Sequence, residues 1–345
     1  MANRGGWRRW LVNRAALIRL AIIGILLGIA IAWAWFTSIW MPGVSYQAAL
    51  PPLTPQEETL RDALRQDVEK IAGELGEHNF SNYKNLAAAA DFLEASLSSA
   101  GYKVQRQGYK IAENTYYNLE AEIAGTNRAD EIVVIGGHYD SVFGSPGAND
   151  NGTGASAVLE LARAFAGKKT SRTLRFVEFV NEEPPFFQTA EMGSVVYAKR
   201  CRNAGDNIVA MLSLETIGYY SDKPGTQNYP FPLSLFYPSQ GNFIAFVSNP
   251  TSADLLRKAI ASFRRHAKFP SEGAALPERI PGVGWSDQWS FWQQGYPGII
   301  VTDTAPSRYP NYHTSQDTPD KIDYDRLARV VAGLEGVVAD LAGLQ

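Results

Sequence analysis

The stretch VIGGHYDSVFGSPGANDNGTGA, residues 134–155, decides the fold of this chain. It begins as a continuous apolar run of the kind that forms a strand buried on both faces of a sheet. It then passes His138, Asp140 and Asp150 within a loop rich in glycine and amide side chains. A run of small and apolar residues follows, which is typical of a helix. A strand, a glycine-rich loop and a helix in this order indicate an α/β unit with polar groups at the strand end.

The same alternation continues on both sides of this stretch. Apolar runs predict strands at residues 102–109, 115–125, 131–137, 172–181, 207–218 and 296–305. Helical spacing predicts helices at residues 55–75, 84–100, 154–167, 191–201, 251–266 and from 324 to the C-terminus. Strands that alternate with helices predict a three-layer αβα sandwich with a central, mostly parallel mixed sheet. Residues 219–243 are predicted to form one long loop rich in aromatic residues and proline, a length that is typical of functional loops.

The N-terminal segment predicts one transmembrane helix before the sandwich. Residues 20–41 carry no charge, and this is about the length that a helix needs to cross a bilayer. Arginines precede the run and tryptophans end it; the arginines are Arg4, Arg8, Arg9, Arg14 and Arg19. This asymmetry predicts a single-pass membrane protein with a cytoplasmic N-terminus and its main domain on the extracytoplasmic side. A cleaved signal peptide is the alternative, because Ala30-Ile31-Ala32 resembles a small-residue cleavage site.

We therefore expect three parts: a basic cytoplasmic end with the anchor at 1–41, an extended linker at 42–55 and one large domain at 56–345. The net charge of −3 gives no basis for binding nucleic acid. Cys201 is the only cysteine, which excludes an internal disulfide and a cysteine-rich zinc site. The oligomeric state is left open by these features.

Ligand-type side chains follow four of the predicted strands. They are His138 with Asp140, then Glu182 with Glu183, then Glu215, and, after a further loop, His313; Asp150 lies in the glycine-rich loop. In open α/β sheets, ligand sites lie beyond the carboxyl ends of the strands. Two histidines with three or more carboxylates are a suitable donor set for two divalent ions, zinc first among them. One of two adjacent glutamates can bind metal while the other holds a proton.

Each of these elements has an ordinary interpretation when it is taken alone. A histidine after a buried strand can be a core residue, a glutamate pair can be a solvated surface, and Asp317 or Thr318 can cap a helix. His78 and His266 lie in polar sequence and are expected at the surface. Only the joint position of the other residues at strand ends favours a common site.

With these motifs in place, the sequence resembles the di-zinc aminopeptidase family, whose relatives include glutamate carboxypeptidases and glutaminyl cyclases. The segments GGHYDS, GANDNGTGA, NEE, SLETIG and YHTSQDTPDKI occur in the family's order and near its spacings. The resemblance covers about residues 83–341 and implies a zinc peptidase domain. It implies that His138 and Glu215 bind one zinc ion, that Glu183 and His313 bind a second, and that Asp150 bridges the two ions.

The resemblance also implies the remaining roles. Glu182 would be the general base, Tyr312 would donate a hydrogen bond to the oxyanion, and Asp140 and Asp287 would be acids that orient the ligands. The chain departs from the family in three places: Glu215 replaces a common aspartate, Gln288 replaces a common histidine, and residues 184–187 read Pro-Pro-Phe-Phe instead of a short glycine-leucine segment.

The expected function is a membrane-anchored, zinc-dependent exopeptidase, foremost an aminopeptidase that hydrolyses N-terminal peptide bonds with a water activated by two zinc ions. Its substrate would be a peptide or an amino-acid conjugate. The 219–243 loop and the Phe186-Phe187 pair are expected to form an apolar pocket. Two alternatives stay open: a glutaminyl-cyclase-like aminoacyltransferase with one zinc ion, and a non-catalytic, membrane-anchored binding protein.

Overall fold

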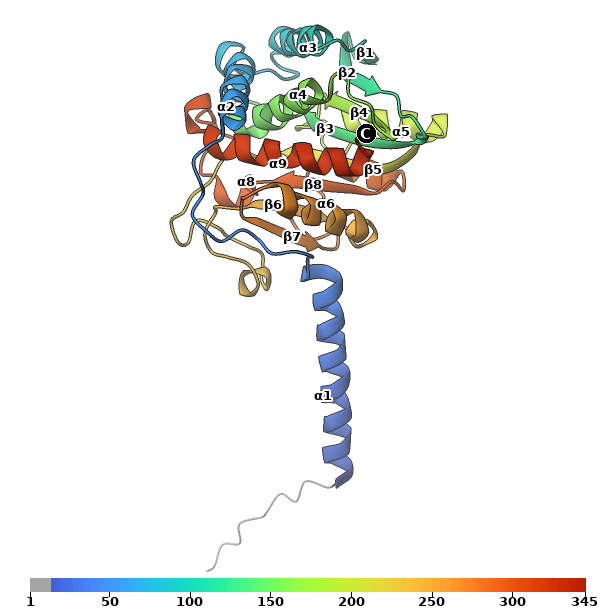
Figure 1. Cartoon of the computed structure of the whole chain (residues 1–345), viewed down its shortest axis with the longest axis vertical. Helices are drawn as coiled ribbons and strands as arrows, with labels where there is room; N and C mark the ends of the chain where they lie inside the picture. The colour runs from blue at the N-terminus through green and yellow to red at the C-terminus, as the bar shows by residue number, and fades with distance from the viewer. Residues whose placement is uncertain (1–13) are drawn as a thin grey trace, which may run out of the picture.

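The computed structural model describes residues 14–345, with side chains from residue 17 onward. It shows an α/β domain at the end of a long helix (Figure 1). The basic residues Arg4, Arg8 and Arg9, which predicted the cytoplasmic side of the chain, lie outside the described residues.

In the described part of the chain, eight strands form one mixed sheet in the order β1-β2-β4-β3-β5-β8-β6-β7. The strands are β1 (Gln105–Ile111), β2 (Asn114–Ile123), β3 (Arg128–His138), β4 (Arg172–Phe179), β5 (Asn207–Glu215), β6 (Ile244–Ser248), β7 (Ser271–Ala275) and β8 (Gly298–Thr302). The central strands β4, β3, β5 and β8 are parallel, whereas β2 pairs with β4 and β6 pairs with β8 in antiparallel register. The predicted mixed sheet with a parallel centre is confirmed. Strands β6 and β7 were not predicted from the sequence.

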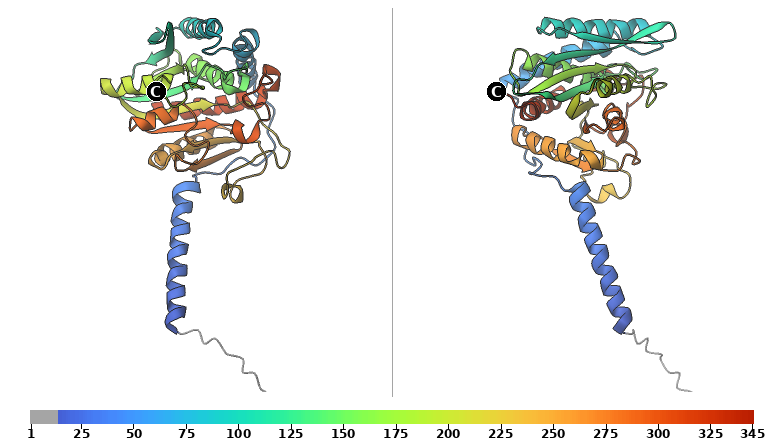
Figure 2. Two further views of the ribbon diagram at one scale, coloured as in Figure 1. Left: turned by 180° about the vertical axis from the view of Figure 1, so that it is seen from behind. Right: turned by 90° about the vertical axis from the view of Figure 1, so that its right-hand side faces the viewer.

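Helices cover both faces of the sheet, as the prediction of three layers requires (Figure 2). The α-helices are α1 (Arg14–Ala34), α2 (Pro55–Val68), α3 (Tyr83–Ser99), α4 (Thr153–Phe165), α5 (Gly193–Ala204), α6 (Ala253–His266), α7 (Gln288–Gln293), α8 (Ala305–Arg308) and α9 (Tyr324–Ala342). Helices α2, α3, α4, α6 and α9 pack on one face, and α5 and α7 pack on the other. The predicted helices are therefore present, and α7 and α8 are short additions.

The apolar run of β3 explains why this strand lies in the centre. Val133 and Ile135 are fully buried in the core under α4 and α9. Ile132 and Val134 point the other way and are buried with α5 and α7. Burial of each such side chain is worth about 1.5–3 kcal/mol, so a strand that is apolar on both sides is stable only between two helical layers.

Helix α1 continues into a short π-helical turn, η1 (Trp35–Ile39), and extends away from the domain (Figure 1). Together the two elements give an apolar stretch, Leu17–Ile39, which is long enough to cross a membrane and has no residue buried in the domain. A signal sequence near the N-terminus would have the same length and composition.

Residues 42–54, which connect the apolar helix to α2, contain no helix or strand and lie along the domain. The Arg264 guanidinium donates to the Pro42 carbonyl at 3.0 Å, and the Ser271 N–H donates to Ser45 Oγ at 2.9 Å. Arg329 donates to the carbonyl of Pro51. This segment is extended, and hydrogen bonds attach it to α6, β7 and α9.

Candidate metal centre

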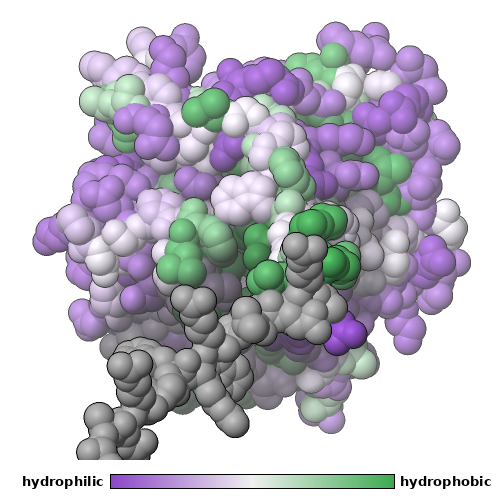
Figure 3. Space-filling model, turned by 90° about the horizontal axis from the view of Figure 1, so that it is seen from below, coloured by the Kyte–Doolittle hydropathy of each residue, from purple (hydrophilic) through white to green (hydrophobic). Residues whose placement is uncertain are grey.

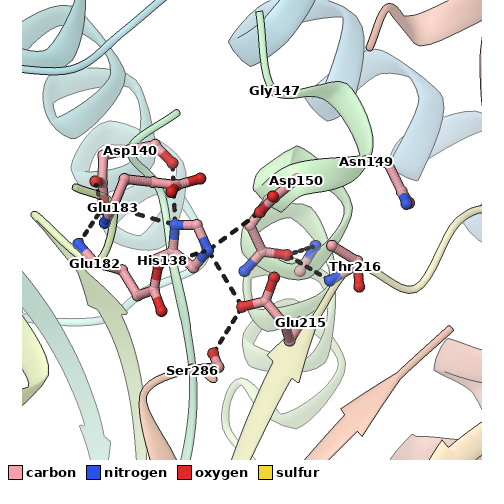
Figure 4. Close-up of polar contacts among 12 residues, drawn as sticks. His138, Asp140, Gly147, Asn149, Asp150, Glu182, Glu183, Glu215, Thr216 and Ser286 are labelled. Atoms are coloured by element: carbon pink, nitrogen blue, oxygen red, sulfur yellow. Dashed lines mark hydrogen bonds and ion pairs between the residues drawn. The ribbon is translucent and has the colours of Figure 1, made fainter. Parts of the chain in front are cut away.

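The candidate site lies at the carboxyl edge of the parallel strands, where three of them end side by side (Figure 4). His138 is the last residue of β3, and Glu215 is the last residue of β5. Glu182 and Glu183 follow the end of β4, which lies on the other side of β3. Parallel neighbours end at the same edge, so side chains separated by long stretches of sequence meet there.

The first group of side chains, which we call the inner group, consists of His138, Asp150 and Glu215. His138 Nε2 lies 3.2 Å from Glu215 Oε2 and 3.5 Å from Asp150 Oδ1. Glu182 Oε2 lies 3.9 Å from the same nitrogen. All of these side chains are buried, and His138 is only 1% exposed. The inner group therefore forms a closed cluster at the strand ends.

The second group, which we call the outer group, consists of Asp150, Glu183 and His313. His313 Nε2 lies 3.0 Å from Asp150 Oδ2 and 3.5 Å from Glu183 Oε1. The side chain of His313 is 34% exposed, so this group borders solvent. Asp150 belongs to both groups and turns one carboxylate oxygen toward each histidine. This is the arrangement that a carboxylate bridging two cations requires.

The donors fit two divalent cations, zinc in particular. Among the described residues, the buried His138 Nε2 and Glu183 Oε1 have no hydrogen-bond partner. Four buried carboxylates, those of Asp150, Glu182, Glu183 and Glu215, would together carry a charge of −4 beside two neutral imidazoles. Two doubly charged cations would balance that charge, and imidazole with carboxylate is a common zinc donor set.

The pKa values of these side chains reflect the crowding of buried carboxylates around the two histidines. Burial raises the pKa of Glu183 to about 8 and the pKa of Glu182 well above its usual range. Burial also opposes ionisation of Asp150, yet the neighbouring His138 and His313 imidazoles outweigh it and lower the pKa of Asp150. Burial lowers the pKa of His313, but Asp150 and Glu183 reverse this and raise it to about 10. Buried carboxylates crowded together thus resist ionisation unless positive charge lies beside them.

Asp140 holds the loop that carries the two glutamates. Its Oδ1 accepts the Glu182 N–H at 3.0 Å, and its Oδ2 accepts the Glu183 N–H at 3.1 Å. The Nδ1 atom of His138 lies 3.0 Å from the backbone carbonyl of Asp140 and 3.6 Å from its carboxylate. The carboxylate of Asp140 therefore serves mainly to position the backbone of Glu182 and Glu183. The partner that lies nearer to His138 is the backbone carbonyl of Asp140.

Asp317 plays the matching part on the other side of the site, which the sequence did not suggest. Its carboxylate oxygens accept the N–H groups of Asn149 at 2.9 Å and Asp150 at 3.0 Å, and it also accepts the Tyr309 hydroxyl at 2.9 Å. Of the two residues expected to cap a helix here, Thr318 occupies the cap position of the following turn, without a side-chain hydrogen bond, and Asp317 does not. Nothing in a polar loop distinguishes a buried aspartate from a capping one.

The asparagines of the glycine-rich loop attach it to the end of β5. Asn151 Nδ2 donates to the Leu214 carbonyl at 2.9 Å, and Asn151 Oδ1 accepts the Thr216 N–H at 3.0 Å. A side chain at Gly154 would place its Cβ 2.2 Å from Asn151 Oδ1 and from the Leu214 carbonyl oxygen. Glycine at this position is therefore required for the close approach of α4 to β5.

Two residues of the segment before α7 lie behind Glu215. The Ser286 hydroxyl donates to Glu215 Oε2 at 2.6 Å, a contact that the sequence did not indicate. Asp287 is fully buried, and its carboxylate has no hydrogen-bond partner among the described residues. Burial raises the pKa of Asp287 to about 7. Ser286 thus orients Glu215, whereas the orienting role expected of Asp287 stays a prediction.

Tyr312 and an apolar cavity lie beside the cluster. The Tyr312 ring stacks on His313 with 3.8 Å between centroids, and burial raises the pKa of its phenol. A cavity of about 290 Å³ opens next to Tyr312 and Glu215. Its walls come from β6, β7, β8, the segment 280–285 and the 219–243 loop, so this loop takes part as predicted.

Two expectations about aromatic and histidine residues are wrong. Phe186 and Phe187 do not line the cavity; Phe186 instead packs on Phe80 and Tyr116, with 5.8 and 6.0 Å between ring centroids. His78 is not a surface residue, because it is 1% exposed and its carbonyl accepts the Ser141 N–H at 3.0 Å. A buried histidine in polar sequence gives no signal of its burial. His266 is exposed, as predicted.

Comparison with known proteins agrees with this geometry. Residues 118–338 match the sequence pattern of the family described as peptidase family M28. An uncharacterised protein of Escherichia coli strain K12, YfbL, is 33% identical over 292 residues, which cover 82% of this chain and 88% of that protein. A zinc aminopeptidase from Bacillus subtilis has a TM-score of 0.66 at 13% identity, over 83% of this chain and 95% of the other. A glutaminyl cyclase of Fimbriiglobus ruber has a TM-score of 0.59 at 20% identity, over 85% and 98% of the two chains. At such identities the two solved structures show a common fold.

Proposed function

Because this chain belongs to peptidase family M28, we propose that it is a zinc-dependent aminopeptidase, held at a membrane by its N-terminal helix, that hydrolyses N-terminal peptide bonds. The observation that carries the proposal is Asp150, whose two carboxylate oxygens face the histidines of two separate donor groups. A non-catalytic binding protein would have no need for a complete donor set with an additional buried glutamate.

In this proposal His138, Asp150 and Glu215 hold one zinc ion, and Asp150, Glu183 and His313 hold the other. Bound zinc supplies Lewis acidity, which polarises a carbonyl group and makes a water molecule more acidic. Asp140 and Asp317 keep the two ligand-bearing loops in place through backbone hydrogen bonds.

Glu182 performs the proton transfers. Its carboxylate takes a proton from the attacking water while the hydroxide oxygen bonds to the scissile carbonyl carbon. The Tyr312 phenol donates a hydrogen bond to the oxyanion that forms. Glu182 then delivers the proton to the leaving amine as the C–N bond breaks.

The cavity beside Glu215 and Tyr312 would receive the side chain of the N-terminal residue. Its walls are mostly apolar, with Leu233, Leu276 and Val283 among them. This lining supports a preference for apolar N-terminal residues. Glu272 on β7 is a charged member of the wall.

Exchange of Glu182 for glutamine tests the proposed base. The Glu182→Gln variant should keep both metal ions but lose about 10²–10⁴-fold in kcat on amino-acid amides, because the amide cannot accept the proton. Glu178→Gln is the matched control: Glu178 is a buried glutamate on β4 whose raised pKa, caused by burial, makes the neutral amide a close substitute. Unchanged hydrolysis by the Glu182 variant would remove Glu182 from the mechanism.

The zinc content of the same samples separates the proposal from glutaminyl cyclisation. We expect two zinc ions per chain and release of free amino acids from dipeptides. One zinc ion, with conversion of N-terminal glutamine to a lactam and no hydrolysis, would favour the cyclase alternative that the common fold admits.

A further inference from the structure

The part of the 219–243 loop that covers the cavity has two different sides. We call residues 229–237 the roof loop. Tyr229, Leu233 and Tyr237 line the cavity. The two tyrosines stack with 5.7 Å between centroids, and the Tyr237 hydroxyl donates to the Gly273 carbonyl at 2.8 Å. The inner side of the loop is thus fastened to the domain.

The other side of the roof loop is apolar and open. Phe231 is 84% exposed, Leu235 is 69% exposed and Phe236 is 45% exposed, and none of them lines the cavity. Three large apolar side chains at one loop tip are unusual on a surface that faces only water. Figure 3 shows this face of the molecule, on which hydrophobic side chains gather near the middle of the view.

The roof loop lies at the depth of the membrane helix. The Phe236 ring meets the Trp35 ring edge to face, with 5.5 Å between centroids. Trp35 belongs to the stretch Leu17–Ile39 and lies four residues before its end. At a rise of 1.5 Å per residue, this places Trp35 about 6 Å inside the end of the span. Phe236 therefore lies at a level where a bilayer surrounding the helix would have its interfacial layer.

The end of the helix is fixed against the domain, which makes this depth a property of the fold. Arg257 on α6 donates to the Thr37 carbonyl at 2.7 Å and to the Phe36 carbonyl at 3.0 Å. Met41 is buried in the main core. Because α6 and the roof loop belong to the same domain, the helix cannot cross a bilayer in this position without bringing the loop tip to the membrane surface.

We propose that Phe231, Leu235 and Phe236 insert into the interfacial layer of the lipid bilayer, so that the cover of the substrate cavity is held by the membrane. The partner is a lipid surface, and the proposal rests on the anchoring part of the proposed function. Aromatic and leucine side chains are those that interfacial segments place at this depth. The cavity beside Glu215 would then open close to the membrane surface.

Spin labels on single cysteines test this placement. The full chain with Leu235→Cys is labelled and placed in nanodiscs of phosphatidylcholine and phosphatidylglycerol, and a second sample carries Phe231→Cys. Cys201 is buried, so the native chain should take up no spin label, and labelling of the native chain is measured as a check. Phe143→Cys is the matched control, because Phe143 is a 70% exposed aromatic residue on a loop beside Glu77. Collision with oxygen, which concentrates in lipid, is compared with collision with a water-soluble nickel chelate.

We expect labels at positions 231 and 235 to meet oxygen several-fold more than the chelate, and the label at 143 to show the reverse. A label at 235 as open to the chelate as the label at 143 would overturn the proposal. Protection from both reagents would also overturn it, since it would mean that a second protein chain covers the loop. The intact mass shows whether residues 1–41 are present: their loss would overturn the anchoring itself, whereas loss of peptidase activity would leave this readout unaffected.

Discussion

The inner and outer groups of the candidate metal centre have the same kinds of donor but different surroundings. The inner histidine, His138, ends a central strand and is 1% exposed. The outer histidine, His313, lies on a loop, has a positive φ of 57° and exposes 34% of its side chain. The ends of β3 and β5 fix His138 and Glu215 of the inner group, whereas Glu183 and His313 of the outer group lie on loops. Under the proposed two-ion assignment, we expect the inner ion to be held tightly and the outer ion, nearer to solvent, to exchange more readily.

Asp150→Ala should have the largest effect, because this residue is the one that joins the two groups. We expect the variant to lose both zinc ions and to lose more activity than Glu182→Gln, whose own loss is about 10²–10⁴-fold. Elemental analysis of the purified variant measures the metal. Asp130→Ala, on the exposed start of β3, is the control. Two ions retained by the Asp150 variant would contradict a bridging role.

His138→Ala and His313→Ala test the comparison itself. His313→Ala should keep one ion per chain, and His138→Ala should lose the inner ion and also unfold at a lower temperature, since it leaves buried carboxylates without their partner. In the native protein, a chelator should remove the outer ion first. Zinc affinity of the outer site in His313→Ala should fall by more than the ~10–100-fold that loss of an outer-shell partner costs. Equal loss of zinc from the inner and outer groups would contradict the proposed difference between them.

Asp317→Asn sharpens the comparison at the bridge. An amide group at position 317 would set an N–H against one of the N–H donors of Asn149 and Asp150. Zinc affinity should fall by ~10–100-fold, with activity partly restored by added zinc. Asp320→Asn, on the exposed side of the same loop, should behave like the native protein. An unchanged zinc titration would show that Asp150 needs no such support.

Asp303→Asn should have the smallest effect on activity, and its effect should instead appear in the pH dependence of stability. Burial raises the pKa of Asp303 to about 7 from an ordinary value of 3.8. The folded state therefore keeps a proton that the unfolded state has lost, and the free energy of unfolding falls by up to ~1.4 kcal/mol per pH unit as the pH rises between ~4 and ~7. The variant should lack this contribution in urea titrations, while Asp130→Asn should retain it. Parallel curves for the native protein and Asp303→Asn would contradict the shift.

The predicted parts of the site came from local signals. The buried strand before His138, the apolar runs before Glu182 and Glu215, and the glycine-rich loop around Asp150 could each be identified in a short window. The supporting residues could not be predicted in this way. Asp317 and Ser286 act on residues far away in the sequence, at 167 residues from Asp150 and 71 residues from Glu215.

The sequence by itself determined the class of fold, the apolar N-terminal segment and the kinds of donor available, because hydrophobic periodicity and residue chemistry are local properties. Only the tertiary structure decided which side chains meet. It turned Phe186 away from the cavity and buried His78, and it set Phe236 against Trp35 about 200 residues earlier in the chain. Contacts of this kind depend on the strand order and on the packing of the whole domain, which no short stretch of sequence contains.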